Sequence, residues 1–449
     1  MRRGAVGLAF LVGLVAAGES SARELWSRGD FALQFSGSLQ ELALGTSETD
    51  QDDFLRAAAR DPDCLLAETF ESCDGFDEVG EKDVFQSRTR LRTRFDLELG
   101  KHVTGLVIYD LQLFGGHLDT FASSLAENIA DDTFIGAEDN LHRGDTVAVR
   151  QSLYRGYLAF EAGPAELVVG RQRVAWGVAK LWNPIDRFNP ISPLALDADQ
   201  SQGIDGVAAR WNLDGFNFFE AVYAPGTSRD EARMALRFHG VVFDTDVSLM
   251  GGRIQRAPTF GLDVSRNLGE AAIGIEVVYT KPERRVRPIG ASKARKPGEY
   301  WQIVASIDRN FAIGDGVYVL LEHLYNGNAL GFGRGKAGPF LNAFEETDSP
   351  IGPVPVPGDV SRFAGSGVVS GARHQTGLDI ATDITPEIRA DLLTLYDWNG
   401  TSAIFYPSLF WNPTSWAEIR LGVQVPVGSR RSEYGSGEVL GFVLTEFFF

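Results

Sequence analysis

Polar and apolar residues alternate along most of the chain after residue 30, in segments of about ten residues that are separated by turn residues. In the clearest segment, 88–99, four arginines and two acidic residues share one face, while leucines, threonines and a phenylalanine share the other. Because side chains alternate across a β-strand, this period predicts strands with one charged and one apolar face. Similar strands are predicted at 243–249, 375–383, 388–397 and 418–424.

The predicted strands number about 18, with 16 as the alternative count. Short connections carry turn residues, as at Gly163-Pro164 and Asn412-Pro413, whereas the long connections are 46–84, 115–147, 177–203, 281–298 and 328–372. The long connections all leave the strands at the same end. An even strand count returns the C-terminus to the starting side.

Two architectures fit such strands. A soluble multi-domain sandwich would show the charged face to water, whereas a membrane barrel would turn it towards a wet lumen. Rows of ionised side chains are costly in a dry core but are solvated in a wide lumen, and long loops at one end favour the barrel. We therefore predict an all-β fold: a single antiparallel transmembrane β-barrel with short periplasmic turns and long extracellular loops.

The first 22 residues have the features of a secretory signal. Two arginines precede a small and apolar run over residues 5–17, and Ser-Ser-Ala at 20–22 offers a cleavage site. The run of about 13 residues is too short to span a bilayer as a helix; a buried amphipathic helix is the alternative. We predict a signal peptide at 1–22, an outer-membrane barrel at 23–449, and the Gram-negative cell outer membrane as the location.

The composition narrows the classes of partner. With 42 Lys or Arg and 60 Asp or Glu among 449 residues, the net charge is −18, so a nucleic acid is not an expected partner. Two cysteines cannot build a four-thiolate metal site. In an oxidising compartment we predict a disulfide between Cys64 and Cys73, with two free thiols as the alternative. The acidic stretch 46–83 is interpreted as a solvated loop rather than a divalent-cation site against lipopolysaccharide.

The chain stops at Phe447-Phe448-Phe449, directly after a strand-like stretch. Three exposed phenylalanines would be an aggregation liability on a soluble protein, but they would anchor a barrel in the interfacial aromatic girdle. A final strand that ends on an aromatic residue resembles the terminal signature of bacterial outer-membrane barrels. The resemblance implies that Phe447 and Phe449 form a signal for the barrel assembly machinery.

A second resemblance lies in the run GRQRVAWG at 170–177 and the stretch LWNPIDRFNP at 181–190. Over 165–211, the chain resembles a family of bacterial outer-membrane porin-like barrels, which implies a passive channel. The loop 177–203 would either fold inward and narrow the channel or cap the barrel rim. In the first case its candidate constriction residues are Trp182, Asp186, Arg187 and Asn189.

Charged residues on the predicted inner faces fall into two groups. The basic group lies in the first half of the strands: Arg88, Arg90, Arg92, Arg94, Arg171, Arg173, Arg210, Arg233 and Arg237. The acidic group lies mostly in the second half: Asp244, Asp246, Asp263, Glu276, Asp308, Glu322, Asp379, Asp383, Asp391 and Asp397. Opposite walls of opposite sign would set up a transverse field that favours small polar solutes. Alternatively, these charges pair across neighbouring strands.

Signals for enzymatic activity are weak. The sequence has no Gly-x-Ser-x-Gly or His-Glu-x-x-His motif. A Gly-x-Gly-x-x-Gly pattern at 333–338 lies in a Gly/Pro-rich loop rather than in a βαβ unit. Among the scattered histidines, His239 and His323 remain candidates for a barrel-embedded hydrolase. We expect no enzymatic activity, no cofactor and no metal.

The sequence therefore predicts an outer-membrane porin, a passive channel for small hydrophilic solutes through a charge-lined lumen. Expected partners are outer-membrane lipid and lipopolysaccharide, the barrel assembly machinery, a small polar solute and, as a candidate, further copies of the chain. The alternatives are an exporter of an anionic polysaccharide, a membrane-embedded hydrolase, and a structural or adhesive barrel. A continuous arginine path would favour the exporter, and a Ser–His–acid cluster on the lipid face would favour the hydrolase. A plugged lumen would favour the structural barrel.

Overall fold

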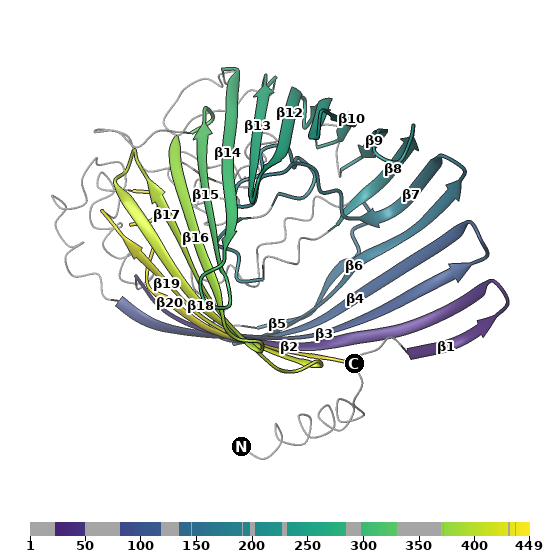
Figure 1. Cartoon of the computed structure of the whole chain (residues 1–449). Coiled ribbons are helices and arrows are strands. Elements are labelled where there is room, and N and C mark those ends of the chain that lie inside the picture. The colour runs from purple at the N-terminus through teal and green to yellow at the C-terminus, as the bar shows by residue number, and fades with distance from the viewer. Residues whose placement is uncertain are drawn as a thin grey trace, which may run out of the picture.

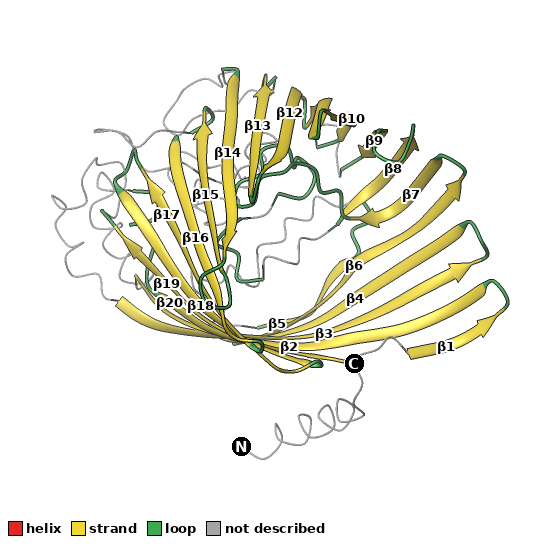
Figure 2. Cartoon of the chain, in the orientation of Figure 1, coloured by secondary structure: helices red, strands yellow, loops and turns green. Residues whose placement is uncertain are grey.

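The computed structural model describes residues 23–49, 81–117, 134–144, 146–190, 192–197, 203–226, 231–283, 298–329, 370, 372–429, 432–435 and 437–449. The predicted signal peptide and the predicted Cys64–Cys73 disulfide lie outside the described residues, so both stay predictions. All regular structure within the described ranges is β-strand (Figure 2). In this part of the chain, no helix is long and apolar enough to cross a bilayer.

The strands form one antiparallel sheet. In chain order they are β1 (Arg23–Arg28), β2 (Phe31–Thr49), β3 (Glu81–Leu99), β4 (Val103–Gly116), β5 (Glu138–Arg143), β6 (Val147–Ala162), β7 (Ala165–Gln172), β8 (Ile204–Asn212), β9 (Phe218–Ala224), β10 (Arg233–Val242), β11 (Thr245–Ile254), β12 (Ala257–Leu268), β13 (Ala271–Thr280), β14 (Tyr300–Phe311), β15 (Val317–Asn326), β16 (His374–Thr385), β17 (Ile388–Asp397), β18 (Ser402–Thr414), β19 (Ala417–Val427) and β20 (Leu440–Phe448).

The sheet closes on itself because β2 pairs with β20 as well as with β3 (Figure 1). The closed wall consists of 18 strands: β2 to β4, then β6 to β20 in order. The two other strands are short additions. β1 pairs with residues 31–35 of β2, beyond the point where β20 ends, and β5 pairs with residues 148–152 of β6, beyond the end of β7. The predicted barrel of about 18 strands is confirmed.

The long connections all leave from one end of the barrel, and the other end has short connections only, among the described residues. At the periplasmic end, hairpins are tight, as at Gly163-Pro164 between β6 and β7 and at Gly269-Glu270 between β12 and β13. The long connections, including those after β2, β7 and β15, leave from the extracellular end. One predicted turn is misplaced, because Asn412-Pro413 lies within β18 and the turn follows Thr414.

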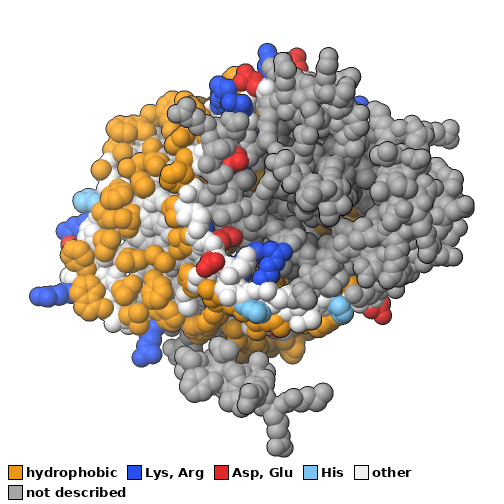
Figure 3. All heavy atoms as spheres, turned by 180° about the vertical axis from the view of Figure 1, so that it is seen from behind, with side chains coloured by type: hydrophobic (Ala, Val, Ile, Leu, Met, Phe, Trp, Pro, Cys, Tyr) orange, Lys and Arg blue, Asp and Glu red, His pale blue; other side chains and the backbone are white. Residues whose placement is uncertain are grey.

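The outer wall is apolar and much of the inner wall is polar. Leu236, Leu249 and Phe260 on the adjacent strands β10 to β12 point outward and are each more than half exposed. Ser248 and Asp263 lie on the opposite, inner face of these strands and are buried. Apolar side chains also cover much of the described outer surface in Figure 3. Because hydrocarbon cannot solvate charge, this distribution fits a wall that faces lipid.

The described residues of the connection between β7 and β8 lie inside the barrel. Of the two predicted positions of this loop, they occupy the inward one. Around Trp182, the loop packs on inward side chains of β2, β14, β15, β17, β18 and β20. Around Trp176 and Phe188, it packs on inward side chains of β8 to β11 and β13. Burial of each large apolar side chain contributes roughly 1.5–3 kcal/mol, so the loop is firmly held.

Candidate functional site in the barrel lumen

Two buried carboxylates of the wall hold the loop by its backbone. Glu276 of β13 accepts hydrogen bonds at 2.6–3.1 Å from the N–H groups of Val178, Ala179 and Ile185. Glu322 of β15 accepts three more at 2.7–3.1 Å, from the consecutive residues 180–182. Irregular backbone inside a barrel loses its hydration, and a carboxylate that accepts several N–H groups compensates for that loss.

Gly177 lets the loop approach Glu276 closely. Its φ of +95° lies in the left-handed region that favours glycine. A Cβ atom at this position would also overlap Asn183 Oδ1 and Glu276 Oε1. The last glycine of the GRQRVAWG run is therefore required for the turn that brings residues 178–182 to the two carboxylates.

The four predicted constriction residues are all buried between the loop and the wall. Trp182 belongs to the apolar packing described above. Arg187 donates from Nη2 to Gln302 Oε1 at 2.8 Å, and Asn189 Oδ1 accepts the N–H of Val174 at 2.8 Å. Their side chains therefore anchor the loop, and the constriction contacts predicted for them stay a prediction.

Asp186, the fourth of these residues, stabilises a turn inside the loop. Its Oδ1 accepts the N–H groups of Phe188 and Asn189 at 3.2 and 2.8 Å. Burial raises the pKa of Asp186 to about 6, although these hydrogen bonds and the charges of Arg173 and Arg233 oppose the rise. Since both bonds use Oδ1, Oδ2 can take a proton while the turn is kept.

The loop reaches the opposite wall at Asp197. Its Oδ2 accepts hydrogen bonds from Arg88 Nη2 at 2.7 Å and Arg90 Nη1 at 2.8 Å, both on β3. Side chains of β19 donate to the carbonyls of residues 194 and 196 at 2.9 and 3.2 Å. Burial alone would raise the pKa of Asp197, but the two guanidiniums outweigh it and lower the pKa, so this carboxylate is ionised.

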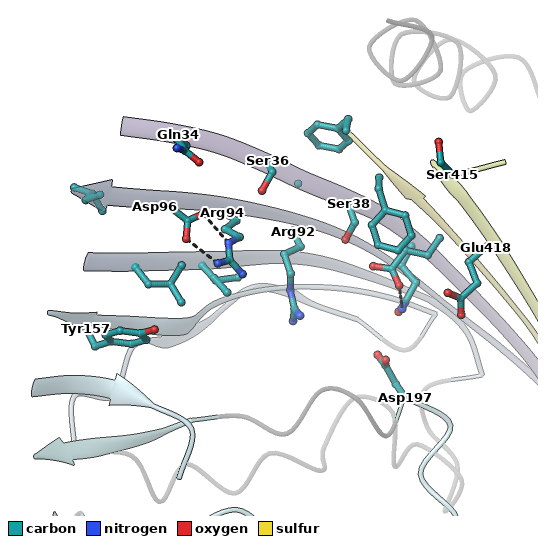
Figure 4. Close-up of a pocket in the computed structure, with 18 of the residues that line it drawn as sticks. Gln34, Ser36, Ser38, Arg92, Arg94, Asp96, Tyr157, Asp197, Ser415 and Glu418 are labelled. Atoms are coloured by element: carbon teal, nitrogen blue, oxygen red, sulfur yellow. Dashed lines mark hydrogen bonds and ion pairs between the residues drawn. The ribbon is translucent and has the colours of Figure 1, made fainter. Parts of the chain in front are cut away.

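A cavity of about 1000 Å³ remains between the loop and the wall. Inward residues of β2, β3, β4, β6, β19 and β20 form its wall side, and Leu196 and Asp197 form its loop side (Figure 4). Its polar lining combines both signs of charge with hydroxyl and amide groups: Arg92, Arg94, Arg420, Asp96, Glu98, Glu418, Glu446, Ser36, Ser38 and Gln40. A space of this size and polarity can hold a small hydrophilic solute together with water.

Most charges predicted to line the pore lie on inner faces of strands. The basic ones are Arg88, Arg90, Arg92, Arg94, Arg210, Arg233 and Arg237. The acidic ones are Asp246, Asp263, Glu276, Asp308, Glu322, Asp379, Asp383, Asp391 and Asp397. Several of the acids are buried; Glu276 and Glu322 bind the loop, and Asp397 accepts N–H groups of the turn after β17.

Two of the predicted lumen positions are wrong. Arg171 lies on the same face of β7 as Leu167 and Val169, which are exposed on the outer wall. It is fully buried there, where it forms an ion pair with Asp205. Asp244 lies exposed in the β10–β11 turn with a φ of +57°, outside the strands. Arg173 follows the end of β7 as an exposed residue at the start of the inward loop, and its role in lining the pore stays a prediction.

The arginines of β3 do not form a free positive wall, because each contacts a carboxylate. Arg92 binds Asp110 of β4 through two hydrogen bonds, Arg94 binds Asp96, and Arg88 and Arg90 share Asp197. Pairing of charges, the alternative to separate walls of opposite sign, describes this part of the lumen.

Sequence reasoning missed Asp197 and an aromatic neighbour of the arginines. Tyr154 of β6 has the guanidinium carbon of Arg92 at 3.7 Å from its ring centroid and that of Arg155 at 4.9 Å. Neither residue interrupts or extends a period-two pattern, so the alternation gave no signal for them. The available signal was the surplus of arginines on β3, which requires an acidic partner from elsewhere in the chain.

A Ser–His–acid arrangement lies on the inner wall. His239 Nδ1 is 3.1 Å from Ser248 Oγ, and His239 Nε2 is 3.7 Å from Asp246 Oδ1. Ser248 is buried, and its Oγ also accepts a hydrogen bond from Arg237 at 2.9 Å, so the hydroxyl is not open to a substrate. Within the described ranges, no group of three or more His, Cys, Asp or Glu side chains is placed to hold a metal ion.

Solved structures share this fold. OccAB1 of Acinetobacter baumannii matches with a TM-score of 0.53 and 10% sequence identity, over 96% of this chain and 98% of that chain. OccK9 (OpdG) of Pseudomonas aeruginosa matches with a TM-score of 0.50 and 11% identity, over 93% of this chain and 98% of that chain. No family model and no curated protein matches the sequence.

The closed antiparallel barrel and these similarities define the class: the chain has the fold of the outer-membrane porins. A closed 18-strand wall with an apolar outer face is what a membrane-spanning β-structure requires. The wall is therefore that of a barrel that spans a membrane, as in the outer-membrane porins whose fold it shares.

Proposed function

We propose that the protein works as a porin, a passive channel through which small hydrophilic solutes cross the outer membrane. The observation that carries the proposal is the polar cavity of about 1000 Å³ that stays open beside the inward loop. A structural barrel with a plugged lumen has no need of such a space. The solutes would pass between the loop and the wall formed by β2, β3 and β4.

The chemistry of the cavity supports sieving by size and polarity. Its hydroxyl, amide and charged side chains can replace part of the hydration of a polar solute, whereas an apolar solute would have to displace water from them. The loop, which the buried carboxylates Glu276 and Glu322 hold across the lumen, limits the width that remains. Passive selection of solutes by size and polarity requires no conformational change of the loop.

The pairing of the arginines favours this function over polymer export. An anionic chain would need a row of positive charges that are free to bind it in turn. On β3, Arg92 and Arg94 are instead neutralised by their neighbours Asp110 and Asp96, and Arg88 and Arg90 share Asp197. The lumen is thus mixed in charge rather than a basic track.

A matched pair of substitutions on β2 tests the path. Ser36 lines the cavity, while Leu39 points outward and pairs with Leu91 and Phe447. Purified wild-type protein and the variants Ser36→Trp and Leu39→Trp would be reconstituted in liposomes, and swelling rates would be measured with uncharged sugars of increasing size. We expect Ser36→Trp to slow swelling, most strongly for the larger sugars, because the indole fills part of the cavity.

Leu39→Trp adds the same side chain to the lipid-facing side and should keep the wild-type rates. Heat-dependent migration in gels would verify that both variants are folded. Equal rates for Ser36→Trp and wild type would place the path elsewhere, and a folded wild-type protein that permits no swelling would contradict the porin function.

A further inference from the structure

The loop brings its own negative charge to the most basic strand of the lumen. Asp197 lies between Arg88 and Arg90, and one carboxylate oxygen accepts a hydrogen bond from each guanidinium. Figure 4 shows Asp197 projecting from the loop towards the strands that form the far side of the cavity. Asp197 is therefore both a lining residue of the cavity and the counter-ion of two arginines.

The surroundings give these arginines little other compensation. Arg88 also donates from Nη2 to the neutral Gln40 at 2.7 Å. Among the ion pairs of the described residues, Arg90 has one other carboxylate partner, Glu446. The distance from Glu446 Oε1 to Arg90 Nη2 is 3.9 Å. Removal of the Asp197 charge would leave two positive charges, mostly shielded from solvent, beside the cavity. Charges shielded in this way act over longer distances than exposed ones.

Asp197 also ties the far end of the loop to β3. The carboxylate anchors Glu276 and Glu322 hold the loop on β13 and β15, on the other side of the lumen. Within the described residues 192–197, Asp197 provides the side-chain link to β3, while β19 holds the carbonyls of residues 194 and 196. The contact of Asp197 with Arg88 and Arg90 thus compensates the charge of the two arginines and also fixes the position of the loop.

We propose that Asp197 is the residue that determines the ionic selectivity of the lumen, as a counter-ion carried by the loop, and that it fixes the loop against β3. The inference rests on the proposed channel function. The ionic selectivity of the wild-type lumen then reflects the balance between the charge of Asp197 and the charges of Arg88 and Arg90. Removal of the carboxylate and removal of an arginine shift this selectivity in opposite directions.

Reversal potentials in planar lipid bilayers under a salt gradient test this role. Asp197→Asn should raise the anion-to-cation permeability ratio about twofold or more, the scale on which a unit charge several ångströms away acts on an ion in water. Arg88→Gln should shift the ratio in the opposite direction, since Asp197 is then only partly compensated. Asp197→Glu keeps the charge and should stay near the wild-type ratio.

Asp244→Asn is the matched control, because it removes the same charge from an exposed turn at the periplasmic end, and it should leave the ratio unchanged. If Asp197 only tethers the loop, Asp197→Asn will change conductance and current noise but not the reversal potential. That result, or shifts of the same sign in Asp197→Asn and Arg88→Gln, would overturn the role in selectivity. Wild-type protein without current would instead overturn the channel function itself.

Discussion

Asp186 is a buried carboxyl group in the loop that crosses the lumen. Burial raises its pKa to about 6 from the ordinary aspartate value of 3.8, so its ionised form is costly at neutral pH. The folded state then binds a proton more readily than the unfolded chain does. The contribution of this group to stability is fully present below about pH 4 and is lost as the pH rises through about 6.

The variant Asp186→Asn should remove this pH dependence. The amide Oδ1 can accept the same two N–H groups without a charge, so the turn is kept. The difference of about 2 pKa units corresponds to about 3 kcal/mol. Urea unfolding in lipid at pH 4 to 8 should show the variant more stable than wild type at pH 7.5, with the difference vanishing near pH 4. A constant difference over this range would contradict the assignment.

The misassigned Arg171 shows why single positions are hard to predict. A shift of one residue in the alternation moves a side chain to the other face of the sheet. Arg171 and Gln172 are neighbours on β7, and the outward one is the arginine. An outward arginine is tolerated in this wall because it is buried in an ion pair with Asp205, which also accepts the N–H of Ile135. No local sequence pattern indicates that these partners come together.

At the scale of elements, β7 and β5 together form one composite neighbour of β6. β7 pairs with residues 156–162 of β6, and β5 pairs with residues 148–152. The ladder along this edge of β6 is therefore interrupted at 153–155. The side chain of Arg171 fills the interruption: Nη1 donates to the carbonyl of Leu153 at 2.7 Å, while Nε and Nη2 bind Asp205. Asp205 Oδ2 also accepts a hydrogen bond from the N–H of Ile135 at 2.7 Å.

Replacement of Arg171 by methionine should therefore weaken the wall at this join. It leaves the buried Asp205 without its cation and the Leu153 carbonyl without its donor, which we expect to cost about 3–5 kcal/mol. The control Arg94→Met breaks an ion pair that is largely open to solvent and should cost less than about 1 kcal/mol. Urea unfolding of both variants in lipid would measure the costs; equal costs would contradict the join.

Strands were easier to predict than turns, for physical reasons. The alternation that defines a strand repeats over many residues, and a barrel that separates lipid from water enforces it on both faces. Two hairpins lack the usual signal, because Phe243-Asp244 and Gln255-Arg256 adopt positive φ at both positions without glycine or asparagine. The pairing of neighbouring strands alone fixes these turns, so local residue preferences could not reveal them.

At the scale of the whole molecule, the loop divides the interior of the barrel into two parts. The loop fills one side of the lumen with apolar packing on two clusters, and polar space remains on the side of β2 to β4. Sequence alternation could predict the barrel, since it concerns each strand and its two solvents. It could not predict the division, because the position of the loop depends on carboxylates that lie 91 to 142 residues further along the chain.

Current recordings from single molecules of purified wild-type protein in a planar bilayer test the central claim most directly. If a water-filled path runs beside the loop, the protein should give discrete steps whose size rises with the salt concentration and is the same for repeated insertions. Folded protein that inserts into the bilayer and gives no steps at any salt concentration would contradict the account.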